Sequence, residues 1–170
     1  MVLNVDGQTY RQPLEVKPDP RVKVEAADYE AQLAMQLRLH RAMATTFAVW
    51  HQVHEVRTRL KPQDQKTAEA SRNDDKPRDE TRPPTLDDQL KAFEDGTQRQ
   101  PGFGPLNRDL GRYMEMAGTA DGRPSQLLQT AVDAQCAELD KKLSEWKEFV
   151  TQRGSELKIQ QAEIGVGCGK

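Results

Sequence analysis

The sequence predicts a mainly α-helical protein, an antiparallel bundle of two long and two short helices preceded by an N-terminal β-hairpin. Apolar residues recur at helical spacing over residues 26–60 and again over 85–164, the two parts of the expected bundle. Near the N-terminus, an Asp-Gly turn signal separates two short segments of alternating polarity. Only 35% of the 170 residues are hydrophobic and the mean hydropathy is -0.86, so part of the chain is solvated rather than packed.

Residues 1–20 are predicted to contain the hairpin, with Asp6 and Gly7 as a type I′ turn. Its alternation places five apolar side chains on one face: Leu3, Val5, Tyr10, Leu14 and Val16. Pro13 lacks an amide, which favours an edge strand or a strand end. An isolated hairpin is marginally stable in water. Either the helices cover it, or it is the end of a β-sandwich-like module that precedes Met1, and we favour the second interpretation.

The first long helix is expected over residues 26–60. One stripe at spacings of three and four carries Met35, Leu39, Ala42, Thr46, Val49, Val53, Val56 and Leu60. Four more residues widen it: Leu33, Leu37, Phe47 and Trp50. The helix is therefore expected to contact more than one neighbour and to end before Pro62.

Residues 61–84 interrupt this pattern and are predicted to be a flexible charged linker. Six basic and six acidic residues lie between positions 61 and 82, with prolines nearby and almost nothing apolar. Such a segment cannot bury enough surface to offset the entropy of ordering it. Its zero net charge also argues against a nucleic-acid-binding arm.

Two short helices are expected after the linker. Thr85 and Asp88 have the spacing of an N-cap and a near capping box, which predicts a helix from there to about Gly96. Pro105 suits the start of a third helix, which Gly118 would end.

The last long helix has the clearest pattern and is expected to include Pro124 in its first turn. Its apolar stripe consists of Leu128, Val132, Cys136, Leu139, Leu143, Trp146 and Val150. Gly154 is expected to end or bend this helix, and the apolar face continues to residue 164. Residues 165–170 are predicted to be a disordered, glycine-rich tail.

Charge and hydropathy exclude several function classes. The net charge of -2 provides no global basic field for nucleic acid, and no apolar run approaches the roughly 20 residues of a membrane span. The first residues lack the basic and apolar regions of a signal peptide. A cytoplasmic location is therefore expected if this chain is complete.

Two parts of the chain carry a family resemblance. Residues 6–16 are DGQTYRQPLEV and are followed by DPRV at 19–22, while the helical ends contain ADYEAQL at 27–33 and AELDKKLSEW at 137–146. These segments resemble the C-terminal region of bacterial secreted sialidase-like or sortilin-type (VPS10-like) β-propeller proteins. Those proteins carry BNR/Asp-box repeats and are labelled glycosyl hydrolases.

The resemblance implies a non-catalytic C-terminal helical accessory or interaction region of a larger secreted protein. Its partners would be the upstream propeller and β-sandwich domains, and its location would be periplasmic or extracellular. No Asp-box motif (Ser-x-Asp-x-Gly-x-x-Trp) occurs in the chain. Any hydrolase chemistry of such a parent would therefore lie upstream of Met1, and we expect no enzyme activity here.

The three histidines, His40, His51 and His54, all fall in the first helix. Imidazoles at such spacings can bind metals, but neither an HExxH motif nor a placed carboxylate completes a ligand set. We interpret them as partly buried or interfacial side chains beside Trp50. A metal protein built on them is the remote alternative, so no metal, cofactor or catalytic residue is assigned.

Two cysteines are too few for a disulfide framework. Cys136 lies in the apolar stripe of the last helix and is interpreted as an inert core thiol. Cys168 lies in the expected tail, where it could pair between chains in an oxidising setting. The carboxylate pairs 74–75 and 87–88 are assigned to solvated or capping roles.

Two non-catalytic functions therefore remain open. The leading one is the accessory region of a larger secreted β-propeller protein. The alternative is a self-contained helical protein–protein interaction or oligomerisation module, in which the stripes of the first and last helices meet a second chain.

Overall fold

The computed structural model describes residues 1–17, 19–68, 83–159 and 167–169. It contains strands β1 (Val2–Val5) and β2 (Gln8–Arg11) and helices α1 (Ala26–Ala68), α2 (Leu86–Glu94), α3 (Phe103–Gly118) and α4 (Gln126–Leu157). The predicted class is confirmed: two long and two short helices follow an N-terminal two-stranded hairpin.

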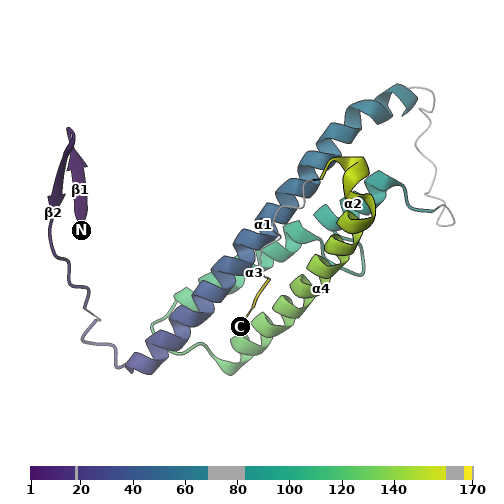
Figure 1. The fold of residues 1–170 in the computed structure, drawn as a ribbon. Coiled ribbons are helices and arrows are strands. Elements are labelled where there is room, and N and C mark those ends of the chain that lie inside the picture. Colours follow the sequence, from purple (N-terminus) through teal and green to yellow (C-terminus); the bar gives the residue numbers. More distant parts are fainter. Residues whose placement is uncertain (18, 69–82, 160–166, 170) are drawn as a thin grey trace.

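Helices α1 and α4 form the long sides of the bundle, and α3 runs antiparallel to both of them (Figure 1). The 43 residues of α1 span about 65 Å at 1.5 Å per residue. Helix α3 packs along α1 and also contacts α4, whereas α2 packs against α1 and α3. A single long helix thus supplies the surface on which the others assemble.

The predicted apolar stripes form the core. In α4 every stripe residue is buried, and in α1 the stripe is buried from Leu39 to Val56, with Met35 and Leu60 half-buried. The polar side chain of Thr46 can be buried in the core because its hydroxyl donates a hydrogen bond to the Ala42 carbonyl at 2.6 Å. Aromatic rings of α2 and α4 close one end, where Phe93 meets Trp146 edge-on with ring centroids 5.1 Å apart.

Amide side chains of α1 hold the other helices in register. Gln32 donates from Nε2 to the carbonyls of Ala117 (2.7 Å) and Ala120 (2.8 Å), which satisfies acceptors at the C-terminal end of α3. Trp146 donates from Nε1 to Gln52 Oε1 at 3.2 Å, which joins α4 to α1. These long-range polar contacts fix how the helices face one another.

The hairpin has the predicted turn and register. Asp6 and Gly7 both have positive φ angles, 47° and 75°, and Leu3 pairs with Tyr10 and Val5 with Gln8. Every residue of both strands is exposed, and the hairpin stands apart from the bundle (Figure 1). Of the two sequence interpretations, cover by the helices is therefore wrong.

Several predicted boundaries are shifted. Helix α1 was expected to end before Pro62, but its backbone stays helical to Ala68, because proline removes only one amide donor and good helix formers follow it. Helix α3 begins at Phe103 rather than at Pro105. Helix α4 begins after an N-cap at Ser125, whose hydroxyl accepts from the Leu128 amide, so Pro124 precedes the helix.

The structure describes only parts of the predicted linker (61–84) and of the predicted tail (165–170). Of residues 61–84, the backbone of 61–68 belongs to α1, residues 83 and 84 precede α2, and 69–82 lie outside the described residues. Of the predicted tail, residues 165, 166 and 170 also lie outside them. Residues 167–169 are described, and Cys168 among them is buried rather than disordered.

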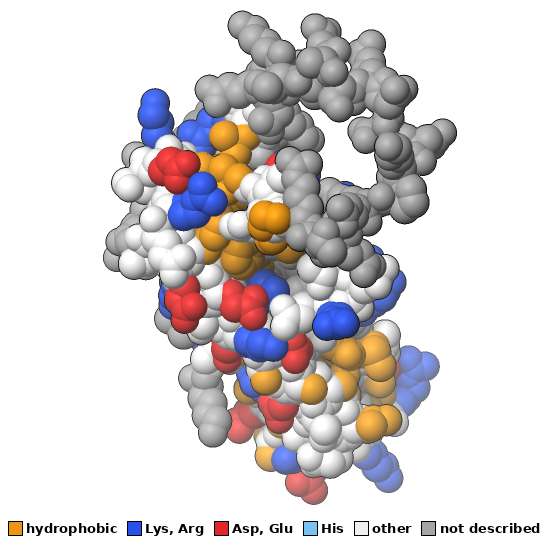
Figure 2. Space-filling model, turned by 90° about the vertical axis from the view of Figure 1, so that its right-hand side faces the viewer, with side chains coloured by type: hydrophobic (Ala, Val, Ile, Leu, Met, Phe, Trp, Pro, Cys, Tyr) orange, Lys and Arg blue, Asp and Glu red, His pale blue; other side chains and the backbone are white. Residues whose placement is uncertain are grey.

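The molecular surface mixes both signs of charge. On the face shown in Figure 2, acidic and basic side chains are interspersed, and hydrophobic side chains gather above and below them. No helix in the described part of the chain combines the length and apolarity needed to cross a membrane.

Candidate functional site

The two cysteines form a disulfide that ties residues 167–169 to α4. Cys136 lies in the α4 stripe and Cys168, 32 positions later in the sequence, is 3% exposed. The interpretation of Cys136 as an inert core thiol is therefore wrong, and in the structure Cys168 pairs within the chain. Sequence spacing gave no sign of the pair, because the contact depends on where the chain after α4 runs.

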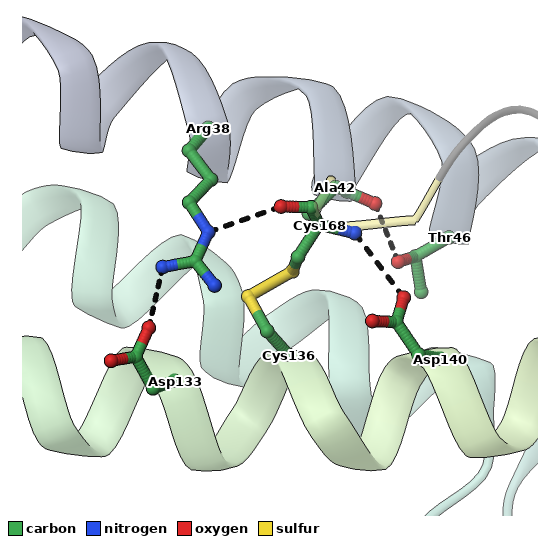
Figure 3. Close-up of a disulfide and its surroundings, with 7 residues drawn as sticks. All are labelled: Arg38, Ala42, Thr46, Asp133, Cys136, Asp140 and Cys168. Atoms are coloured by element: carbon green, nitrogen blue, oxygen red, sulfur yellow. Dashed lines mark hydrogen bonds and ion pairs between the residues drawn. A yellow bond between two sulfur atoms is a disulfide. The ribbon is translucent and has the colours of Figure 1, made fainter. Parts of the chain in front are cut away.

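Charged side chains of α1 and α4 bind the main chain at Cys168 (Figure 3). Arg38 donates from Nε to the Cys168 carbonyl at 3.1 Å and from Nη1 to Asp133 at 2.6 Å. The Cys168 amide donates to Asp140 Oδ1 at 3.4 Å. We call residues 167–169 the strap, and Cys136, Arg38, Asp133 and Asp140 the strap site. Both backbone polar groups of Cys168 are thus satisfied by the strap site.

Gly167 is needed for this close approach. A Cβ atom at this position would overlap Oδ1 of Asp140 and lie 3.1 Å from Cδ1 of Leu143. Rotation of the Asp140 carboxylate could relieve the overlap, but it would break the hydrogen bond from the Cys168 amide. The strap site therefore favours glycine immediately before the cysteine.

The disulfide decides whether the strap stays docked. Ordering the backbone of three residues costs about 1–2 kcal/mol for each. Two hydrogen bonds to charged groups contribute about 1.5–3 kcal/mol each, so the two terms nearly cancel. Because the ordering cost and the hydrogen bonds nearly cancel, the covalent bond between Cys136 and Cys168 makes the docked state the favoured one.

A second polar cluster joins α1 to α2. Glu94, whose side chain is 8% exposed, accepts hydrogen bonds from His54 Nδ1 at 2.6 Å and from Arg57 Nη1. Arg57 also donates from Nε to Asp87 at 2.9 Å. His54 stacks on Trp50 with ring centroids 5.1 Å apart. These contacts place His54 beside Trp50, in the interhelical role that the sequence suggested.

The charges of this cluster stabilise one another. Burial alone would raise the pKa of the Glu94 carboxyl, but hydrogen bonds and charge from His54 and Arg57 lower that pKa below its usual value. Asp87, and to a smaller extent Glu94, raise the pKa of the Arg57 guanidinium. Glu94 and Arg57 therefore remain ionised as a pair between the two helices.

The other two histidines do not join this cluster. His40 is exposed, and His51 lies 3.8 Å from Glu55 on the outer side of α1. Among the described residues, no group of three or more His, Cys, Asp or Glu side chains is placed to hold a metal ion. The pair at 74–75 lies outside the described residues, whereas Asp87 and Asp88 serve an ion pair and a helix cap.

The hairpin presents an uncovered apolar face. The side chains of all five residues predicted on that face are exposed: Leu3, Val5, Tyr10, Leu14 and Val16. Each strand of an antiparallel pair also leaves its outer backbone amides and carbonyls available for another strand. Pro13 lacks an amide just beyond β2, so the edge of β1 is the more accessible one.

The outer side of α1 carries a second exposed apolar set. Leu33, Leu37 and Phe47 are 55%, 50% and 57% exposed. The prediction that this helix contacts more than one neighbour is confirmed, because α1 contacts α2, α3 and α4. The core contacts of α1 lie on the side of the Leu39–Val56 stripe, however, and these three side chains remain exposed.

The structure defines a small helical bundle with a disulfide-held strap and a detached hairpin. Comparison of the chain with protein-family models, curated proteins and solved structures finds no match in any of the three. Its function is therefore inferred from its own residues and their geometry.

Proposed function

We propose that this chain is a non-catalytic helical accessory and interaction module whose hairpin completes a β-sheet of an adjoining β-domain. The exposed hairpin carries this proposal. A two-stranded ribbon with one apolar face gains stability when further strands cover its edge and face. The adjoining domain would be the β-sandwich-like module of a larger secreted, glycosyl hydrolase-like β-propeller protein.

The disulfide supports a location outside the cytoplasm. Disulfides persist in oxidising compartments such as the periplasm and the extracellular space, and are rare where thiols are kept reduced. The bond between Cys136 and Cys168 holds the strap against the bundle, so it contributes to the structure of the module. A secreted parent protein would supply the oxidising setting that this bond requires.

Amide hydrogen exchange, combined with the intact mass of the native gene product, tests this proposal. In the 170-residue chain, the amides of β1 and β2 should exchange rapidly while those in the middle of α4 are protected. The native product should be several times heavier than 19.2 kDa, and its hairpin amides should be protected.

Two results would contradict the proposal. The first is a hairpin that is as well protected as α4 in the monomeric 170-residue chain. The second is a native product of 19.2 kDa with an unprotected hairpin. The second result would favour a stand-alone module instead.

Self-association is the second candidate function, and the exposed outer side of α1 favours it. Leu33, Leu37 and Phe47 form an apolar surface of the kind that a second helix covers. Sedimentation velocity at increasing protein concentration should then show a dimer that Leu37→Glu removes. Leu127→Glu is the matched control, because Leu127 is 81% exposed at the start of α4. A monomer at every concentration would exclude this candidate.

A further inference from the structure

We propose that the strap site is a docking site for an extended segment in which glycine precedes cysteine, and that the strap of a second copy of this chain can occupy it. In the structure the chain's own strap fills the site. The inference does not depend on the proposed function, because it concerns a different surface from the hairpin.

The strap site recognises main chain as well as sulfur. Arg38 binds the carbonyl of Cys168, Asp140 binds its amide, and Asp133 holds Arg38 in place through a 2.6 Å ion pair (Figure 3). These contacts fix the direction of the bound segment, since the donor and the acceptor lie on opposite sides of the cysteine. The sulfur is directed at Cys136 in the α4 stripe.

The site also selects the residue before the cysteine. A side chain at position 167 would overlap the Asp140 carboxylate, so glycine is the residue that fits. A segment in which glycine directly precedes cysteine is therefore the chemistry that this site accepts.

A second copy is the occupant because the strap is an exchangeable element. Helix α4 ends at Leu157, so undocking of residues 167–169 breaks no hydrogen bond within a helix. Exchange of an identical element between two protomers recreates the same contacts in each site, which is the basis of domain swapping. The strap of a second copy carries the glycine, the cysteine and the backbone groups that the site binds.

Thiol–disulfide exchange connects the two arrangements without net oxidation. The thiolate of a small monothiol attacks Cys168 Sγ, the bond to Cys136 breaks, and Cys136 leaves as a thiolate. The Cys136 thiolate of a second copy then attacks Cys168 Sγ in this mixed disulfide and expels the small thiol. The same monothiol attack on the second copy is what frees its Cys136 thiolate. In the complete exchange, therefore, two protein disulfides are broken, two are formed between the copies, and both monothiol molecules are regenerated.

Isotope mixing tests the proposal on the unmodified chain. Isotope-labelled and unlabelled protein are combined with a small monothiol at increasing protein concentration, quenched with acid, digested and analysed by mass spectrometry. Peptides that join Cys136 of one isotope form to Cys168 of the other should increase with concentration. They should also be more abundant than peptides that join Cys136 to Cys136 or Cys168 to Cys168. Peptides from a single isotope form at every concentration would overturn the proposal, as would a statistical mixture of all pairings.

A matched pair of glycine variants tests whether the strap site directs the exchange. Gly167→Ala should lower the yield of mixed-isotope Cys136–Cys168 peptides roughly three- to tenfold, because it costs the hydrogen bond to Asp140. Gly169→Ala, at an exposed position, should leave the yield unchanged. Equal yields from the two variants would contradict recognition by the site. Both positions lie outside the helices, and an unchanged circular dichroism spectrum checks that the bundle is intact.

Discussion

At the scale of single residues, Glu94 is a buried charged side chain that depends on its partners. Its carboxylate is buried between α1 and α2 and is compensated by His54 and Arg57. Its pKa is lowered, so the folded state favours the ionised form more strongly than the unfolded state does. Glu94 therefore stabilises the fold above the unfolded pKa of about 4.3, and this contribution is lost as the pH falls through the folded pKa.

Glu94→Gln should lower the free energy of unfolding by about 1–3 kcal/mol at pH 7, because hydrogen bonds between charged groups are lost. The difference from the unmodified chain should shrink below about pH 4, where the carboxyl becomes protonated. Urea unfolding at both pH values measures this effect. Glu55→Gln, an exposed control on α1, should change stability by less than about 0.5 kcal/mol. A pH-independent difference would contradict the role given to the Glu94 charge.

At the scale of single elements, α2 depends on its first turn. The helix has only 9 residues, too few to be stable alone in water. Thr85 accepts a hydrogen bond from the Asp88 amide, and the Asp88 carboxylate accepts one from the Thr85 amide, which completes the predicted capping box. Packing of Leu90 into the core and the ion pairs of Asp87 and Glu94 with Arg57 of α1 also hold the helix in place.

Thr85→Ala should destabilise the chain by about 1 kcal/mol, because it leaves the Asp88 amide in the first turn without its side-chain acceptor. Chemical denaturation measures the change. Thr151→Ala is the control, because that hydroxyl donates to the Lys147 carbonyl within α4 and caps no helix. An equal loss in the two variants would show that the capping box contributes nothing beyond the general effect of removing a hydroxyl.

At the scale of the whole molecule, the disulfide joins the strap to a bundle held together mainly by apolar packing. Reduction of Cys136–Cys168, with the thiols then blocked, should lower the free energy of unfolding by about 2–4 kcal/mol, since the cross-link closes a loop across 32 positions of sequence. Thermal unfolding with and without a dithiol reductant measures the loss. Double substitution of both cysteines by serine should reproduce it without reductant, and an unchanged unfolding temperature would contradict the prediction.

Much of the local structure was predictable from the sequence alone. The Asp6-Gly7 turn set the hairpin register, the stripe from Leu128 to Val150 identified the buried side of α4, and Thr85 identified the start of α2. Each of these features depends on hydrogen bonds or periodicity within a few residues, so neighbouring positions carry the information.

Only the tertiary structure decided which distant groups meet. The sequence did not indicate that Cys136 pairs with Cys168, that Arg38 and Asp140 bind the strap, or that Glu94 lies between His54 and Arg57. Nor could its periodicity show that Leu33, Leu37 and Phe47 face outward, since a wide apolar stripe is compatible with either arrangement. These contacts depend on the path of the chain between helices, and that path is set by the packing of the whole bundle rather than by local propensity.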